Sequence, residues 1–353
     1  MRRPRAASAD GASKSDQSVP LKRDVDAAAN RWSRTGPGTL FVAGWGARGF
    51  RFAHPRGDGS WSHDKDISVR DIPPKPGTGT GAARIGISGW TYPPWRGVFY
   101  PKGLPHRREL EYVANRLASV EINGSFYSLQ RPSSYQSWHD QTPDGFVFSV
   151  KGPRFVTHMK KLRDVDTPLA NFFANGLLAL RDKLGPILWQ LPPSLGYDAE
   201  RMESFLSRLP HSTGEAAWLA RRHDDRVKDR SLTETDVDRP LRHAIEVRHT
   251  SFTAPAFIDQ LREHEVAIVA ADTAGRWPKI TEATTGFAYA RLHGDKELYT
   301  SGYTPEGLAA WAATVRTWTD SGRDAFVYFD NDVKVRAPFD AVALTELIGV
   351  KFA

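Results

Sequence analysis

The sequence predicts an α/β protein built as a TIM-type (β/α)8 barrel with a disordered N-terminal extension. Eight short apolar runs of β-forming residues alternate with helical segments between residues 84 and 353. This alternation is typical of repeated βα units, and eight units in about 250 residues are what a closed barrel requires. An open, doubly wound sheet is the alternative architecture. With 40% hydrophobic residues, the chain can bury a large core.

The first 83 residues differ in composition from the rest of the chain. They are rich in Ala, Ser, Asp, Arg and Gly without periodicity, and they include the proline- and glycine-rich stretch 73–81. They contain 14 Lys and Arg against 8 Asp and Glu, whereas residues 84–353 contain 34 against 33. We therefore expect a low-complexity basic extension and linker at 1–83, mostly disordered, and a nearly neutral barrel domain at 84–353.

The predicted helices lie in the intervals between predicted strands, except the last, which follows the eighth strand. Two helices have specific start signals, because Thr167 and Thr304 are each followed by proline. The first of these is expected to run to residue 184, where Gly185 stops it. The predicted strands are 84–88, 120–123, 146–151, 187–191, 244–248, 267–272, 287–293 and 326–330. The predicted helices are 107–117, 133–141, 168–184, 198–209, 215–222, 255–264, 305–318 and 339–348.

Polar side chains end nearly every predicted strand. In a barrel, alternate residues of a strand point inward, and catalytic groups sit at the carboxyl-terminal strand ends. Because Ala288, Ala290 and Leu292 suit the side that faces the helices, Arg291 and His293 point inward at the mouth. The same rule turns Glu246, Arg248 and Asp330 inward. Asp272 shares a face with Ile268 and Ala270, and its place at a strand end still assigns it to the mouth.

These strand ends, with residues of the loops beyond them, form the candidate site. The predicted acid/base residues are Glu246, Asp272 and Asp330. The predicted substrate-binding residues are Lys151, Arg248, Arg291, His293, Asn123, Gln190, Trp90, Tyr92 and His158. Glu121 adds a further carboxylate to this ring. The structural alternative is a ring of mutually neutralising ion pairs that fixes the register of the barrel.

The signs of the charges constrain the ligand. Three cations in the same ring repel a divalent metal, so metal binding is disfavoured and no cofactor is predicted. Arg and Lys among Asn, Gln and His suit a small anionic or sugar-like molecule. Cysteine chemistry is excluded because the chain has no cysteine. The glycine pattern at residues 44–49 is not followed by a helical segment, so it does not predict a dinucleotide site.

The sequence contains neither a membrane-spanning segment nor an export signal. No apolar run approaches the roughly 20 residues that span a bilayer. The basic start of the chain is followed by Ala, Ser, Asp and Gly rather than by the apolar region of an export signal. A cytoplasmic protein without a membrane partner is therefore expected.

Seven groups of motifs, in order along residues 84–350, resemble the YecE-like family, also called domain-of-unknown-function family seventy-two. They are IGISGW (85–90) with FYP (99–101), EIN (121–123) with FY (126–127), FSVK (148–151) with TH (157–158), QLPP (190–193), EVRH (246–249), RLHG (291–294) and FDN (329–331). The resemblance implies a TIM-type barrel in a bacterial cytoplasmic protein, and it implies no reaction. Gly124, Phe252 and Asp340 depart from the residues that this family tends to have.

Three functions follow from these observations. The first is an enzyme, a hydrolase or an isomerase, that uses acid/base chemistry on a small anionic or sugar-like substrate at the carboxyl-terminal mouth of the barrel. The second is a metal-assisted nucleic-acid phosphodiesterase or repair-type enzyme, which the near-neutral charge of residues 84–353 disfavours. The third is a non-catalytic binding or scaffold barrel.

Overall fold

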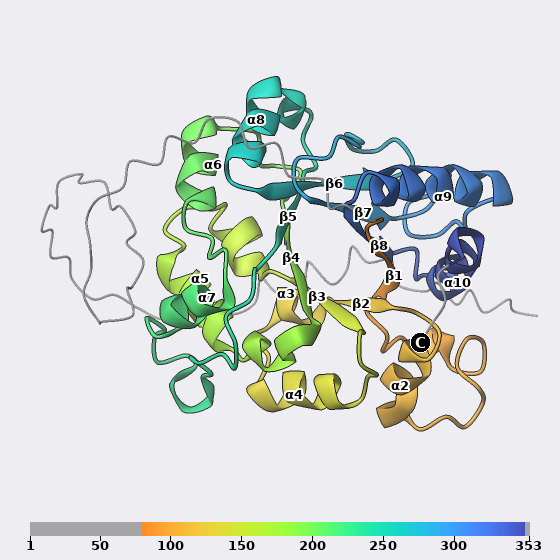
Figure 1. Cartoon of the computed structure of the whole chain (residues 1–353), viewed down its shortest axis with the longest axis horizontal. Helices are drawn as coiled ribbons and strands as arrows, with labels where there is room; N and C mark the ends of the chain where they lie inside the picture. The colour runs from red at the N-terminus through yellow and green to blue at the C-terminus, as the bar shows by residue number, and fades with distance from the viewer. Residues whose placement is uncertain (1–79, 350–353) are drawn as a thin grey trace, which may run out of the picture. The chain divides into compact units, whose positions relative to one another are not determined.

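The computed structural model describes residues 80–349, and they form a closed barrel of eight parallel strands in sequence order (Figure 1). The predicted disorder of the N-terminal extension and the glycine pattern at 44–49 lie outside the described residues, apart from the last few positions of the extension. The strands are β1 Ala83–Ser88, β2 Ser119–Ile122, β3 Val147–Lys151, β4 Leu184–Gln190, β5 His243–Glu246, β6 Val266–Asp272, β7 Phe287–Leu292 and β8 Asp324–Phe329. The (β/α)8 barrel predicted from the sequence is confirmed, and the open sheet is excluded.

Neighbouring strands pair all round the barrel, and the register shifts in β3 between Phe148 and Val150, where it pairs with β4. Strand β1 pairs with β2 on one side, through Ser88 and Glu121, and with β8 on the other, where Ile85 lies opposite Val327. Strands β4 and β5 align Gln190 with Glu246. Because all strands run in the same direction, their polar last residues lie at one end of the barrel.

Helices surround the barrel in the intervals where they are predicted. They are α2 Glu109–Ala114, α3 Gly124–Tyr127, α4 Pro132–Asp140, α5 Asp166–Ala174, α6 Ala199–Leu206, α7 Thr213–Ala220, α8 Pro255–Glu263, α9 Pro305–Asp320 and α10 Ala337–Ile348. Short 3-10 turns lie at η2 Pro93–Trp95, η3 His106–Arg108, η5 Leu177–Lys183, η6 Lys228–Arg230 and η7 Thr250–Thr253, and a π-helical turn at η4 Phe155–Met159. The start signal of α9 is confirmed, since the Thr304 side chain accepts a hydrogen bond from the Gly307 amide.

The single helix predicted over 168–184 is wrong. Helix α5 ends at Ala174, and Gly176 takes a left-handed conformation with φ 106° before η5 begins. A Cβ atom at Gly176 would lie 2.4 Å from the Cα of Pro132, so the close approach of α4 requires glycine there. Gly185, expected to end the helix, lies inside β4 instead.

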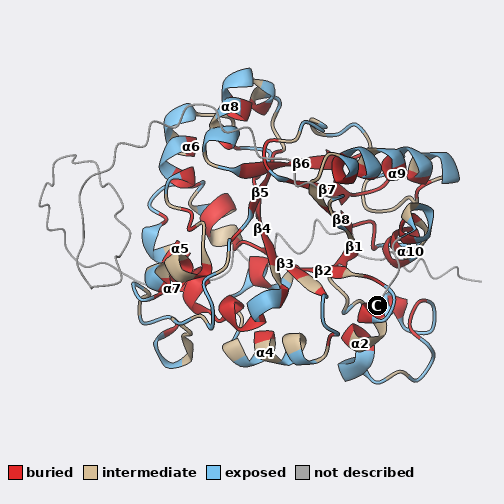
Figure 2. Cartoon of the chain, viewed as in Figure 1, coloured by how far each residue is buried: buried red, intermediate tan, exposed pale blue. Residues whose placement is uncertain are grey.

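Apolar side chains form one layer outside the barrel and another inside it. Burial is concentrated on the strands, whereas the outward faces of the helices are exposed (Figure 2). The inner layer contains Phe287, Tyr289, Phe326 and Tyr328. The Tyr289 hydroxyl lies 2.7 Å from the hydroxyl of Ser149, and it donates to Glu121 at 2.7 Å. The inner core therefore meets the polar strand ends through hydrogen-bonded tyrosines.

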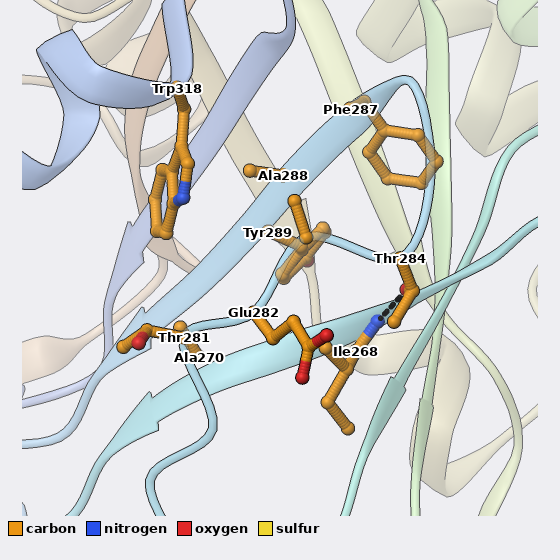
Figure 3. Close-up of a pocket in the computed structure, with 10 residues that line it drawn as sticks. Ile268, Ala270, Thr281, Glu282, Thr284, Phe287, Ala288, Tyr289 and Trp318 are labelled. Carbon is orange, nitrogen blue, oxygen red and sulfur yellow. Dashed lines mark hydrogen bonds between the residues drawn. The ribbon is translucent and has the colours of Figure 1, made fainter. Parts of the chain in front are cut away.

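A small cavity lies outside the barrel, between β6, β7 and Trp318 of α9 (Figure 3). Its volume is about 10 Å³, room for about one water molecule. Beside it, the Thr284 hydroxyl accepts a hydrogen bond from the Ile268 amide at 3.0 Å and donates to the Val266 carbonyl at 2.7 Å. This cavity is a packing gap and is too small for a substrate.

Candidate functional site

Arg291, on β7, is the centre of the charged ring. Its side chain is fully buried, and its Nε and Nη2 atoms donate to the two carboxylate oxygens of Glu121 at 3.0 and 2.8 Å. Its Nη1 atom donates to Glu246 at 2.8 Å, and Nη2 lies 3.3 Å from Asp330. Ser88 accepts a further hydrogen bond at 3.2 Å. The guanidinium therefore holds together carboxylates from β2, from β5 and from the end of β8. Its N–H donors are engaged by these contacts.

Glu246, on β5, is held as an ionised carboxylate. It accepts hydrogen bonds from Gln190 at 2.9 Å, from Arg248 at 2.9 Å and from Arg291. Burial alone would raise the pKa of Glu246, but the charges of Arg248 and Arg291 hold it well below its usual value. A carboxylate fixed in this way orients the two arginines and is a poor proton donor.

His293 lies just beyond β7 and is paired with Asp330. Its Nδ1 atom is 3.0 Å from the Asp330 carboxylate, and its Nε2 atom is 3.4 Å from Arg291 and 3.6 Å from Glu246. The imidazole is fully buried, whereas Asp330 is 5% exposed. His293 therefore positions Asp330, and Asp330 is the member of the pair that faces the mouth.

Lys151, at the end of β3, is the cation of the ring that lacks an anionic contact. Within residues 80–349, its Nζ atom has no hydrogen bond or ion pair, and it lies 4.3 Å from the centre of the Phe126 ring. The side chain is buried, with 7% of the residue exposed. Burial and the charge of Arg291 lower the pKa of Lys151 to about 7. The amine of Lys151 therefore loses its proton near neutral pH.

Arg248 and His158 lie beside Lys151 at the mouth. Arg248 donates to Glu246 and to the Tyr299 hydroxyl at 3.3 Å, and its guanidinium lies 4.1 Å from the centre of the Trp277 ring. Burial, Arg248 and Lys151 lower the pKa of His158 to about 4. His158 is therefore a neutral imidazole at neutral pH.

Trp90, Tyr92 and Asn123 line a cavity of about 450 Å³ next to the ring. The Tyr92 hydroxyl donates to the Ser88 carbonyl at 2.5 Å. Burial and the charges of Asp332 and Asp330 raise the pKa of Tyr92 well above its usual value. Tyr92 is therefore a neutral phenol that lies between this cavity and Asp330.

The structure does not bring Asp272 into the ring, and the predicted position at the mouth is wrong. Residues Ala267, Val269 and Ala271 of β6 point inward, so Asp272 falls on the other side of the strand. Its carboxylate accepts a hydrogen bond from Trp311 of α9 at 2.9 Å and lies 3.4 Å from Lys279. Alternation along the strand decides the direction of this side chain.

Asp272→Asn is expected to leave catalysis within a few-fold of the wild type, because the carboxylate contacts α9 rather than the ring. The loss of its contacts is expected to lower the free energy of unfolding by about 1 kcal/mol. The measurements are a thermal melt and, once a substrate is known, kcat/KM. A loss of activity by two orders of magnitude in a folded variant would return Asp272 to the reacting groups.

Several residues near the ring were not identified from the sequence. Tyr299 and Asp332 lie in loops after β7 and β8, where no periodicity indicates a direction. Trp138, Gln130 and Gln141, near or within the predicted helix 133–141, line the cavity beside Trp90. Tyr289 could have been found, because the alternation that places Arg291 inward also places Tyr289 inward.

Residues 80–349 contain no group of three or more His, Asp or Glu side chains that could hold a metal ion. Among the same residues, no helix combines the length and the apolar character needed to cross a membrane.

The chain is similar to known proteins both in sequence and in fold. The family model described as "Protein of unknown function DUF72" matches residues 84–353. The UPF0759 protein YecE of Escherichia coli K12 is 26% identical over 164 residues, which are 44% of this chain and 57% of that protein. The chain therefore spans little more than half of this relative. The UPF0759 protein YunF of Bacillus subtilis is 21% identical over 76% of this chain and 95% of its own length.

Two solved structures have a similar fold. A DUF72 family protein from Thermotoga maritima matches with a TM-score of 0.62 and 25% identity, over 76% of this chain and 100% of that chain. One from Enterococcus faecalis matches with a TM-score of 0.60 and 16% identity, over 77% and 97%. The family model covers the entire barrel, from the first strand onward. The chain therefore belongs to the DUF72 family of proteins of unknown function.

Proposed function

We propose that this barrel is an enzyme that moves protons on a small anionic or sugar-like substrate at its carboxyl-terminal mouth. Lys151 is the general base. The observation that carries the proposal is the amine of Lys151, which is buried without an anionic contact and has a pKa of about 7. A base with a pKa near the working pH combines a large neutral fraction with useful basicity.

Asp330 is the second proton-transfer group. It lies 3.3 Å from Arg291 and is oriented by His293 at 3.0 Å, and its charge acts on the amine of Lys151. In an isomerisation, the Lys151 amine takes the proton from one carbon and returns it to the neighbouring carbon. Asp330 accepts the hydroxyl proton and delivers it to the carbonyl oxygen. In a hydrolysis, the same amine takes a proton from the attacking water, whose oxygen bonds to the substrate as the bond to the leaving group breaks, and the lysine ammonium then gives that proton to the leaving group.

The remaining ring residues support these two groups. Arg248 is the cation nearest to the outside, with 11% of its side chain exposed, and it is suited to neutralise negative charge on the substrate. Arg291 and Glu246 are fully buried and hold the ring in place without touching the substrate. The three groups that meet the substrate are therefore Lys151, Asp330 and Arg248.

The experiment is a ligand screen followed by a turnover assay. The full chain is melted with sugars, sugar phosphates, organic acids, nucleotides, short oligonucleotides and divalent metals. A ligand at a hundred times its Kd adds about 2.7 kcal/mol to the free energy of unfolding. Ligands that bind are then incubated in D2O, and products and deuterium incorporation are followed by NMR.

The expected result is turnover or deuterium incorporation by one anionic or sugar class, with a rate that rises with pH through about 7 as Lys151 loses its proton. A ligand that binds at the mouth without turnover or exchange would contradict the proposal and favour a binding protein. Stabilisation only by metals and oligonucleotides would favour a phosphodiesterase instead.

A further inference from the structure

The cavity beside the charged ring has the dimensions of a ligand site. Its volume is about 450 Å³, within the roughly 300–1,000 Å³ common for small-molecule sites. It is lined by residues that follow β1 and β2, by Leu110 of α2 and by Trp138 of α4. The ring contributes Tyr92 and Asn123 to the same wall. Lys151, Asp330 and Arg248 do not line the cavity, and Tyr92, whose pKa the charge of Asp330 raises, links it to them.

Asn123 presents an unused hydrogen-bond acceptor in this wall. Its Oδ1 atom is buried and has no hydrogen-bond partner among the described residues. A hydrogen bond from Asn123 acts to lower the pKa of Tyr92, which means that the amide donates to the phenol oxygen. The donor side of Asn123 is thus engaged, and the acceptor side has no partner among the described residues. A buried acceptor without a donor costs about 1–3 kcal/mol, and a ligand hydroxyl would recover that free energy.

Two further amides line the cavity with their nitrogen atoms already bonded. Gln130 donates to the Ser128 carbonyl at 2.9 Å. Gln141 donates to the Ser137 carbonyl at 2.9 Å. Both carbonyl partners are acceptors, so the orientation of each amide is fixed, and each side chain has an oxygen left to accept a hydrogen bond. The polar wall therefore favours a ligand that is rich in donors.

Indole rings form the apolar part of the cavity. Trp90 and Trp138 meet edge to face, with ring centres 5.4 Å apart, and both are only partly buried. Indole rings suit packing against the C–H face of a sugar ring. Two basic side chains also line the cavity: His106 is bonded to Glu109 at 2.6 Å, and Arg107 is exposed, so that water solvates its charge.

We infer that this cavity binds an uncharged, polyhydroxylated part of the substrate, such as a sugar ring. Its hydroxyl groups donate to Asn123, Gln130 and Gln141, and its apolar face packs on Trp90 or Trp138. This inference rests on the proposed function, because it gives the substrate class of the same site. Tyr92 links the cavity to the charged ring, because it lines the cavity and the charge of Asp330 raises its pKa.

The test titrates the full chain with methyl glycosides of glucose, galactose and mannose, followed by tryptophan fluorescence and calorimetry. We expect saturable binding of at least one glycoside and a change in fluorescence, because two indoles line the cavity. Asn123→Leu is expected to weaken this binding at least about tenfold, since a sugar hydroxyl loses its acceptor. Gln130→Leu is expected to weaken glycoside binding as well. Because Gln130 lies nearer the surface, this variant tests the same prediction if Asn123→Leu does not fold.

Two controls separate this inference from the proposed function. Gln260→Leu, on α8 and away from the cavity, removes an amide of the same kind and is expected to leave binding unchanged. Lys151→Met is expected to keep glycoside binding while losing turnover. Binding without turnover in the wild type would therefore contradict only the proposed function.

Three results would overturn the inference itself. The first is the absence of saturable binding by every methyl glycoside. The second is binding that Asn123→Leu and Gln130→Leu both leave unchanged. The third is binding of sugar phosphates and inorganic phosphate without binding of the neutral glycosides, which would show recognition of the anion alone.

Discussion

Arg291→Met is expected to lower the free energy of unfolding by about 3–5 kcal/mol, enough to unfold a barrel of ordinary stability at moderate temperature. The substitution leaves Glu121 and Glu246 buried without the cation that holds them at 2.8 Å. Removing one partner of a buried ion pair costs more than the pair contributes, because an uncompensated charge remains in a medium that solvates it poorly. Chemical denaturation of the full chain measures the effect.

The matched control is Arg108→Met. Arg108 also binds a carboxylate at 2.8 Å, that of Glu111, but both side chains are about half exposed. Water solvates the charge left behind, so the melting temperature is expected to stay unchanged. Equal effects of the two substitutions would show that the buried ring does not depend on Arg291.

Lys151→Met is expected to reduce kcat/KM by roughly 10²–10⁴, the usual contribution of a general base, while the protein stays folded. Methionine has a similar length and no charge, so it removes the amine without creating a large cavity. Full activity in this variant would show that Lys151 is not the base. Asp330→Asn would then be the next substitution to examine.

The same variant tests the pKa of Lys151 through stability. The pKa in the folded protein, about 7, lies below the ordinary value of 10.5, so protonation favours the unfolded chain. The wild type is therefore destabilised relative to Lys151→Met below pH 7, and the penalty disappears as pH rises from about 7 to about 10.5. Between pH 7 and 9 the wild type is expected to gain roughly 2 kcal/mol on the variant. A constant difference would mean that the amine titrates normally.

The sequence was sufficient for the barrel and for the direction of most strand ends. Arg291, His293 and Glu246 lie in the ring as expected, because a period of two in the apolar residues gives the inward face, and Lys151 was expected there from its position at a strand end. The predicted position of Asp272 is wrong, although the same rule gives the observed one. Asp272 alternates with inward-facing Ala271 and therefore points outward, whereas its prediction rested on its position at a strand end.

The roles within the ring could not be predicted. The sequence predicts that charged residues gather at one mouth of the barrel. It does not show that Arg291 donates hydrogen bonds to carboxylates, or that the amine of Lys151 contacts an aromatic ring instead of a carboxylate. Such differences depend on distances of a few ångströms between strands far apart in the chain. The break at Gly176 was missed for a similar reason, because the approach of Pro132 from α4 requires it.

The pairing of Glu121 with Arg291 joins residues that are 170 positions apart, and Glu246 precedes the same arginine by 45. During synthesis the two carboxylates leave the ribosome before the cation that neutralises them. Strand β8, which closes the barrel against β1, follows later still. A nascent chain therefore cannot bury Glu121 at low cost until nearly all of its sequence is available. Completion of the charged ring and closure of the barrel are consequently late, coupled events in folding.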